Sequence, residues 1–170
     1  MQLKDYIRNV PDFPTPGIQF KDITPLLKAP DAFREAIDEL ARYCATRAID
    51  VIAAVDARGF LLAAPLAYRL QKPLIPIRKA GKLPFDTHKV TYFLEYGTDA
   101  VEVHQDAVAD GQRVLVVDDL LATGGTLAAT VKLIETAGAR VDSLLVLVEL
   151  LDLNGRSVLE GYDVHSLIQF

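Results

Sequence analysis

Residues 113–126, RVLVVDDLLATGGT, decide the fold that this sequence predicts. A β-branched run begins at Val114 and is apolar on both alternating faces, which is typical of an interior parallel strand. Asp118 and Asp119 stand at the carboxyl end of that predicted strand. The loop 122–126 then leads into a helical pattern, so free backbone N–H groups gather at a helix N-terminus, where they attract phosphate.

The acids and glycines of this stretch exceed what an ordinary helix cap requires. A threonine at the N-cap would suffice for capping. Adjacent carboxylates repel each other unless a cation or sugar hydroxyls compensate, and the pair Gly124 and Gly125 costs helix propensity unless the backbone approaches a ligand closely. No lysine follows Gly125, which disfavours a P-loop. The combination favours a ligand with a phosphate beside hydroxyl groups, such as ribose 5-phosphate.

The rest of the chain alternates short apolar strands with helical patterns, which predicts an α/β fold with a parallel sheet flanked by helices. Ligands bind such sheets at the carboxyl ends of the strands. An alternating pattern around Gly97 predicts a β-hairpin flap beside the site. The predicted strands are 50–55, 73–77, 113–117 and 141–148, the predicted helices are 32–48, 59–70 and 125–137, and the hairpin covers 90–104.

Composition restricts the class of protein. The 170 residues, 51% of them hydrophobic, predict one domain, 1–170, with its own core. A net charge of −5 argues against a nucleic-acid partner, and no apolar run is long enough to cross a membrane. Cys44, the only cysteine, lies on the apolar side of a helical pattern, and no signal peptide is evident, so we expect a cytoplasmic location. His88, His104 and His165 lack metal-ligand spacing.

Two further loops carry cations where strands are predicted to end. The segment 56–60, DARGF, places Arg58 beside a glycine, and the segment 78–84, RKAGKLP, brings three cations together. Both loops would lie at the same edge of the sheet and could bind an anion. The alternatives are an ion pair between Arg58 and Asp56 and a solvated basic loop.

The order and spacing of these motifs resemble the type I phosphoribosyltransferases, in the form found in the members that act on adenine. The resemblance runs from Pro11 to about Leu151 and includes the proline-rich segment 11–25, whose prolines exclude a long helix. It implies a purine salvage enzyme that transfers the 5-phosphoribosyl group from phosphoribosyl pyrophosphate (PRPP) to N9 of adenine, giving AMP and pyrophosphate. It also implies Mg²⁺ carried by PRPP without a direct protein ligand, and a homodimer.

The resemblance assigns the residues that would bind PRPP. Asp118 and Asp119 would hold the ribose 2- and 3-hydroxyls. The 5-phosphate would lie against Ala122, Thr123, Gly124, Gly125 and Thr126. The pyrophosphate would contact Ala57, Arg58, Lys79 and Lys82, with Arg78 as a further candidate. A cis peptide, sometimes found in this loop of the family, would fall at Asp56–Ala57.

The resemblance also assigns the base site. Residues 1–30 would form a hood in which Phe20 stacks on the purine, while the backbone of Gln19 and Lys21 reads the adenine edge. Residues 85–104 would form a mobile loop and hairpin that closes over the site.

Catalysis would depend on the same loop. In the related 6-oxopurine enzymes an aspartate occupies the position of Ala122 and handles the N7 proton. Here Glu95, with Tyr96, would handle that proton. Arg58 would be the catalytic cation that stabilises the leaving pyrophosphate. A 6-oxopurine phosphoribosyltransferase and a regulator that binds PRPP or a nucleotide without turnover remain the alternatives.

Overall fold

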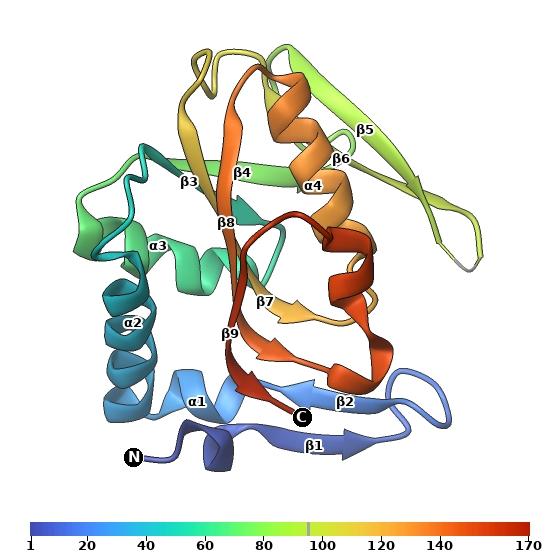
Figure 1. Ribbon diagram of the computed structural model, residues 1–170. Coiled ribbons are helices and arrows are strands. Elements are labelled where there is room, and N and C mark those ends of the chain that lie inside the picture. Colours follow the sequence, from blue (N-terminus) through green and yellow to red (C-terminus); the bar gives the residue numbers. More distant parts are fainter. Residues whose placement is uncertain (95) are drawn as a thin grey trace.

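The computed structural model describes residues 1–94 and 96–170, and its centre is a seven-stranded sheet with the order β5-β6-β4-β3-β7-β8-β9 (Figure 1). Strands β4, β3, β7, β8 and β9 run parallel to one another, whereas β6 is antiparallel to β4 and β5. The strands are β3 (Val51–Val55), β4 (Leu74–Lys79), β5 (Thr87–Phe93), β6 (Thr98–His104), β7 (Arg113–Leu121), β8 (Arg140–Glu149) and β9 (Val164–Gln169). The predicted α/β fold with a mostly parallel sheet is confirmed.

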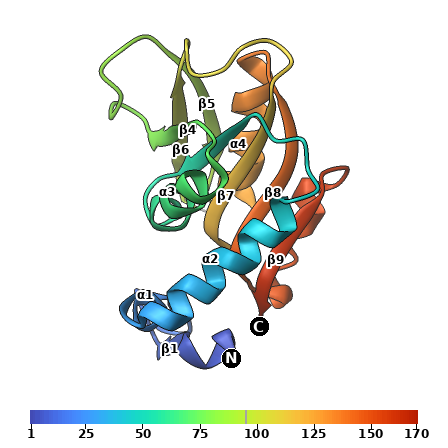
Figure 2. The same cartoon turned by 90° about the vertical axis from the view of Figure 1, so that its left-hand side faces the viewer.

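Helices cover both faces of the sheet, as the alternation of β3 requires. Ile52 and Ala54 belong to the apolar cluster under α2 and α3, whereas Val51 and Ala53 belong to the cluster under α4. Figures 1 and 2 show α2 and α3 on one side of the sheet and α4 on the other. The α-helices are α1 (Thr24–Lys28), α2 (Pro30–Cys44), α3 (Gly59–Leu70) and α4 (Gly125–Thr136), and the 3₁₀ helices are η1 (Leu3–Tyr6), η2 (Leu151–Leu153) and η3 (Gly155–Leu159).

The N-terminal hood segment forms a second, two-stranded antiparallel sheet. Strand β1 (Arg8–Pro11) pairs with β2 (Gln19–Asp22), with Val10 opposite Phe20. The proline-rich stretch between the strands forms turns and bends rather than a helix, as its prolines predict. This small sheet lies at the bottom of Figure 1, close to the C-terminal strand β9.

Three predicted elements differ from the structure. Strand β7 continues to Leu121, so Asp118 and Asp119 lie within the strand because its pairing with β8 persists past them. The helix predicted for 32–48 is α2, which begins earlier and ends at the buried Cys44. The hairpin begins at Thr87 and is part of the main sheet, because buried valines of β6 pack on α4.

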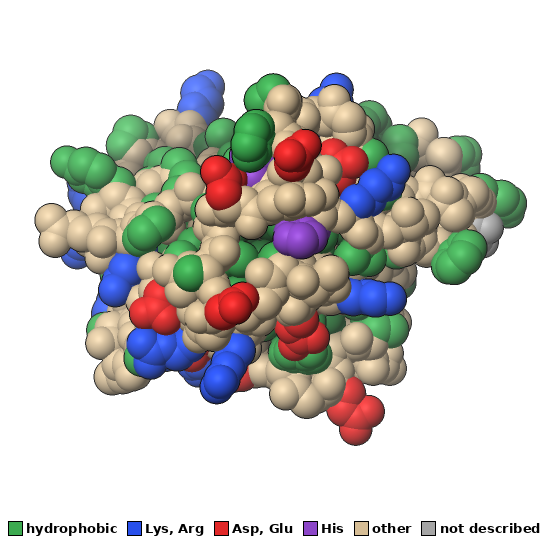
Figure 3. All heavy atoms as spheres, turned by 90° about the horizontal axis from the view of Figure 1, so that it is seen from above, with side chains coloured by type: hydrophobic (Ala, Val, Ile, Leu, Met, Phe, Trp, Pro, Cys, Tyr) green, Lys and Arg blue, Asp and Glu red, His purple; other side chains and the backbone are tan. Residues whose placement is uncertain are grey.

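None of the helices formed by residues 1–94 and 96–170 is long and apolar enough to cross a membrane. Figure 3 views the molecule from above and shows Lys and Arg side chains scattered among Asp and Glu side chains. Charges of both signs are therefore mixed on this face.

Candidate active site

The loops that follow β3 and β7 lie side by side, because these two strands are parallel neighbours. Gly59 begins α3, and a Cβ atom at this position would lie 2.9 Å from the Val117 carbonyl oxygen and 3.1 Å from Asp118 Oδ1. Only glycine allows the loop to approach the acidic strand so closely. The peptide bond Asp56–Ala57 is cis, as the resemblance implied.

Asp119 of β7 is 5% exposed and incompletely hydrogen-bonded, whereas its neighbour Asp118 is partly exposed. Asp118 Oδ1 accepts a hydrogen bond from the Asp119 backbone N–H at 2.8 Å. Arg58 Nε lies 2.9 Å from Asp119 Oδ2, but the N–H does not point at that oxygen, so Oδ2 has no hydrogen-bond partner among the described residues. An ion pair without its hydrogen bond leaves this buried oxygen available to a hydroxyl donor.

The same burial changes how the two acids ionise. Burial raises the pKa of Asp118 well above its usual range, and the negative charge of Asp119 raises it further. Burial also raises the pKa of Asp119, although the Arg58 guanidinium opposes this effect. Both carboxylates are therefore less well solvated than in the unfolded chain, and a ligand that supplies hydroxyl groups would relieve that cost.

The phosphate loop is shaped by its contact with the C-terminal segment. Gly124 has a φ of 87°, and a Cβ atom there would lie 2.5 Å from the Gly155 carbonyl oxygen. A Cβ atom on Gly155 would in turn overlap the Ala122 carbonyl oxygen. The loop and the start of α4 surround a pocket of about 90 Å³ lined by Asp118, Leu120, Leu121, Ala122, Thr123, Gly124, Gly125, Thr126 and Leu127.

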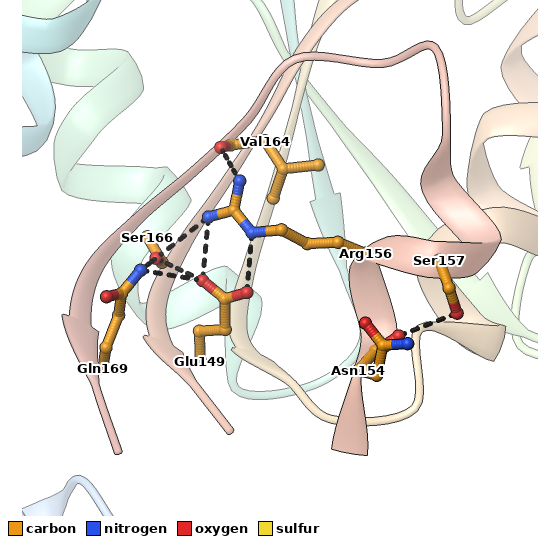
Figure 4. Close-up of polar contacts among 7 residues, drawn as sticks. All are labelled: Glu149, Asn154, Arg156, Ser157, Val164, Ser166 and Gln169. Atoms are coloured by element: carbon orange, nitrogen blue, oxygen red, sulfur yellow. Dashed lines mark hydrogen bonds and ion pairs between the residues drawn. The ribbon is translucent and has the colours of Figure 1, made fainter. Parts of the chain in front are cut away.

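An ion pair holds that C-terminal segment in place, and the sequence did not indicate it. Arg156 of η3 donates to both carboxylate oxygens of Glu149, at 2.7 and 2.8 Å, and to the Val164 carbonyl oxygen at 2.9 Å (Figure 4). Glu149 is 3% exposed and also accepts a hydrogen bond from Ser166. The pair joins η3 to β8 and β9, so the segment that touches the phosphate loop is fixed to the sheet.

Arg78 and Lys79, at the end of β4, have partners of their own. Arg78 Nε lies 3.2 Å from Asp56 Oδ2, so Asp56 pairs with Arg78 and the alternative ion pair with Arg58 is wrong. Lys79 forms an ion pair with Asp99 of β6 and donates to the Tyr92 hydroxyl at 3.1 Å. Lys82 is exposed.

The hood brings Phe20 to the cation of the first loop. The Arg58 guanidinium carbon lies 5.0 Å from the centre of the Phe20 ring, a cation–π distance. The side chains of Gln19 and Lys21 instead bond to Asn9 of β1, at 2.7 and 3.0 Å. A mostly apolar groove of about 440 Å³ adjoins this sheet and is lined by Gly17, Ile18, Gln19, Lys21, Leu150, Asp152, Leu153 and Phe170.

The predicted proton relay is described only in part. Glu95 lies outside the described residues, and the side chain of Tyr96 is 88% exposed. The hairpin residue that does reach the site is Tyr92, whose hydroxyl lies 3.1 Å from Thr126 Oγ1. The sequence offered one signal for it, since Tyr92 alternates with the buried Val90 on the inner face of β5.

The fold and the site define the class of protein, and comparison with known families agrees. The phosphoribosyl transferase domain family matches residues 20–164, so the chain belongs to the phosphoribosyltransferase family.

Individual relatives specify which member it is. Adenine phosphoribosyltransferase from Thermoanaerobacter pseudethanolicus is 56% identical over 169 residues, covering 99% of this chain and 98% of that protein. A crystal structure of the enzyme from that organism has a TM-score of 0.97, with 99% of this chain and 98% of that chain covered. This chain is therefore placed among the adenine phosphoribosyltransferases of type I.

More distant relatives have been solved with ligands. The Saccharomyces cerevisiae enzyme, in complex with an imino-altritol bisphosphate and adenine, is 38% identical with a TM-score of 0.92, covering 98% of this chain and 96% of that one. The Trypanosoma brucei enzyme, in complex with AMP, pyrophosphate and ribose-5-phosphate, is 25% identical with a TM-score of 0.90, covering 99% of this chain and 78% of that one.

Proposed function

We propose that this protein forms AMP and pyrophosphate from adenine and PRPP in purine salvage, by transfer of the 5-phosphoribosyl group to N9 of adenine. The observation that carries the proposal is the buried Asp119 Oδ2 atom, which lies beside Arg58 and has no hydrogen-bond partner among the described residues, while its neighbour Asp118 lines the phosphate pocket. A phosphorylated sugar would supply the missing hydroxyl donors and an anion in one molecule.

The sugar is held at two points. Asp118 and Asp119 accept hydrogen bonds from the ribose 2- and 3-hydroxyls, which replace the solvation that burial removed. The 5-phosphate occupies the pocket formed by Ala122, Thr123, Gly124, Gly125 and Thr126. Fixing both ends of the ribose presents its anomeric carbon to the base in a constant orientation.

The base binds under the hood. Phe20 stacks on the purine, and the backbone of Gln19 and Lys21 recognises the adenine edge, since backbone groups offer both a donor and an acceptor. Ala122 brings no carboxylate to the phosphate loop, in contrast to the 6-oxopurine enzymes, which supports adenine as the base. The cocrystallised adenine of the yeast relative agrees with this assignment.

The leaving pyrophosphate needs positive charge. Arg58, Lys79 and Lys82, with the Ala57 backbone, stabilise the negative charge that builds on it. We expect the Mg²⁺ ion to be carried by the diphosphate oxygens and water, which are the ligands that this hard ion prefers. When bound, the ion neutralises part of the diphosphate charge.

Glu95 is the residue we assign to the N7 proton, with Tyr96 beside it. Residues 85–104 close over the reactants and exclude water, which would otherwise hydrolyse the oxocarbenium-like centre. A single domain spanning 1–170 and a cytoplasmic location remain predictions from the sequence, and a homodimer remains a prediction from the family resemblance.

A base-specific assay tests the reaction. Purified protein is incubated with PRPP, Mg²⁺ and either adenine, guanine, hypoxanthine or xanthine, and nucleotide formation is followed spectrophotometrically. We expect AMP from adenine and no turnover of the 6-oxopurines. Turnover of a 6-oxopurine instead of adenine would identify the alternative enzyme, and AMP binding without turnover of any base would identify a regulator.

A further inference from the structure

The hydroxyl of Tyr92 connects two parts of the site that the sequence motifs treat separately. It lies 3.1 Å from Thr126 Oγ1 of the phosphate loop and accepts a hydrogen bond from Lys79 Nζ at 3.1 Å. Asp99 Oδ2 lies 3.3 Å from the same hydroxyl and also pairs with Lys79. Tyr92 is thus in contact with the loop proposed for the 5-phosphate and with the lysine proposed for the pyrophosphate.

The donors and acceptors in this contact impose a direction. The Lys79 ammonium can only donate, so the Tyr92 oxygen accepts from it. The single hydroxyl proton of Tyr92 is then free for either Asp99 or Thr126. A phosphate in the loop can only accept, so a Thr126 hydroxyl that donates to it must accept from Tyr92. The bonds then form one chain, from Lys79 through Tyr92 and Thr126 to the phosphate.

The charges of Lys79 and Asp99 agree with hydrogen-bond donation that runs from Lys79 toward the phosphate. Burial lowers the pKa of Lys79, but hydrogen bonds to Asp99 and Tyr92 outweigh burial and raise it. The hydrogen bond from Lys79 holds the pKa of Asp99 below its usual value. The chain therefore begins at a charged ammonium, and successive donation from a charged group polarises each following hydrogen bond.

We propose that Tyr92 is a positioning residue that couples the two phosphate groups of the substrate. When the 5-phosphate binds, the Tyr92 hydroxyl turns from Asp99 to Thr126 and orients the Thr126 hydroxyl toward the phosphate. The same bond fixes Lys79 for the pyrophosphate. This inference rests on the proposed function and extends it, since it adds a link between the two ends of PRPP.

The experiment compares Tyr92→Phe with the wild-type enzyme and with Tyr162→Phe. Tyr162→Phe is the control, because it also removes a hydrogen bond donated by a tyrosine hydroxyl. That hydroxyl donates to Glu135 at 2.7 Å, at the far end of α4. We expect Tyr92→Phe to raise KM for PRPP about tenfold, as for loss of one charge-assisted hydrogen bond. We expect it to leave KM for adenine within about twofold, and Tyr162→Phe to change neither.

A double-mutant cycle with Thr126→Val tests the coupling itself. If Tyr92 acts through Thr126, the valine substitution raises KM for PRPP less in the Tyr92→Phe background than in the wild type. Inhibition by pyrophosphate weakens in Tyr92→Phe as well, since Lys79 loses its positioning partner.

Three results would overturn the coupling: additive effects of the two substitutions, unchanged inhibition by pyrophosphate, or equal rises in KM for PRPP and adenine, which would indicate general distortion. The proposed function is judged separately, because it fails only if the wild-type protein makes no AMP from adenine. Chemical denaturation of each variant verifies that the folded state is retained.

Discussion

The Arg58 Nε atom lies 2.9 Å from Asp119 Oδ2, while the same guanidinium faces the Phe20 ring. One side chain is therefore in contact with the acid assigned to the sugar and with the aromatic residue assigned to the base. Because the guanidinium is planar and delocalised, it can serve both neighbours at once, which a lysine ammonium cannot.

We predict that Arg58→Lys lowers kcat/KM for both PRPP and adenine by about tenfold or more, since it keeps the charge and loses the planar contact. Steady-state kinetics with each substrate varied in turn provide the measurement. The matched control is Arg69→Lys, because Arg69 lies on α3, the helix that Arg58 precedes, and pairs with Asp38 at 2.8 Å. An effect confined to one substrate would contradict the shared role of Arg58.

Asp118→Asn is expected to stabilise the free protein and inactivate it. The folded-state pKa of Asp118 is raised above its unfolded value, so the folded state binds more protons between those two pKa values and its stability falls as the pH rises through that range. Asparagine does not ionise, so its stability does not fall in this way, and its side-chain oxygen can still accept the hydrogen bond from the Asp119 N–H. At neutral pH the free energy of unfolding should rise by on the order of 1 kcal/mol.

Urea denaturation at pH 7 and at pH 3 separates this effect from other causes. The gain at pH 7 should disappear at low pH, where Asp118 of the wild type is protonated in both states. Activity should fall steeply at the same time, because the amide is a poorer acceptor for a ribose hydroxyl. An equal gain at both pH values would show that ionisation is not its origin.

Gly155→Ala should weaken PRPP binding, although Gly155 lies outside the phosphate loop. The new Cβ atom would overlap the Ala122 carbonyl oxygen and lie 2.8 Å from Leu121 Cδ1, so either η3 or the phosphate loop must move. We expect a loss of about 1–3 kcal/mol in stability and a KM for PRPP that rises more than the KM for adenine. Ser157→Ala on the same helix, which loses an exposed hydrogen bond to the Asn154 carbonyl oxygen, is the control and should leave both constants unchanged.

Glu149→Gln should remove the contribution that the ionised Glu149 carboxylate makes to the free energy of unfolding. The Arg156 guanidinium is the main reason why the pKa of Glu149 falls to about 2, below its unfolded value. Its contribution is present above the unfolded pKa and is lost as the pH falls through the folded pKa, between about pH 5 and pH 2. We expect the variant to be less stable than the wild type at pH 7 by on the order of 2 kcal/mol, with the difference shrinking toward pH 2. A constant difference over this range would rule out the ion pair as its source.

The local parts of the fold were predictable because their signals lie in consecutive residues. The β-branched run of β7, its two acids and the glycines before α4 specify strand, turn and helix without help from distant segments. The parallel neighbours β3 and β7 then bring Arg58 to Asp119, as the common edge of the sheet predicts.

The remaining features depend on contacts that no local pattern encodes. Alternation in β5 indicates that Tyr92 faces inward, but not that Thr126 and Lys79 meet it there. The pairing of β1 with β2 was missed because four-residue strands beside prolines lack a readable period. Arg156 was missed because its effect on the phosphate loop passes through the packing of Gly155.

The contact between Gly124 and Gly155 also bears on the order in which the chain is made. The ribosome releases the phosphate-loop sequence before the η3 residues that support it. The Lys4 ammonium of η1 donates to the Gln169 carbonyl oxygen of β9 at 2.7 Å, so segments far apart in the sequence also meet at β9. A nascent chain that already displays the complete motif would therefore gain its binding shape only when η3 has packed against the phosphate loop.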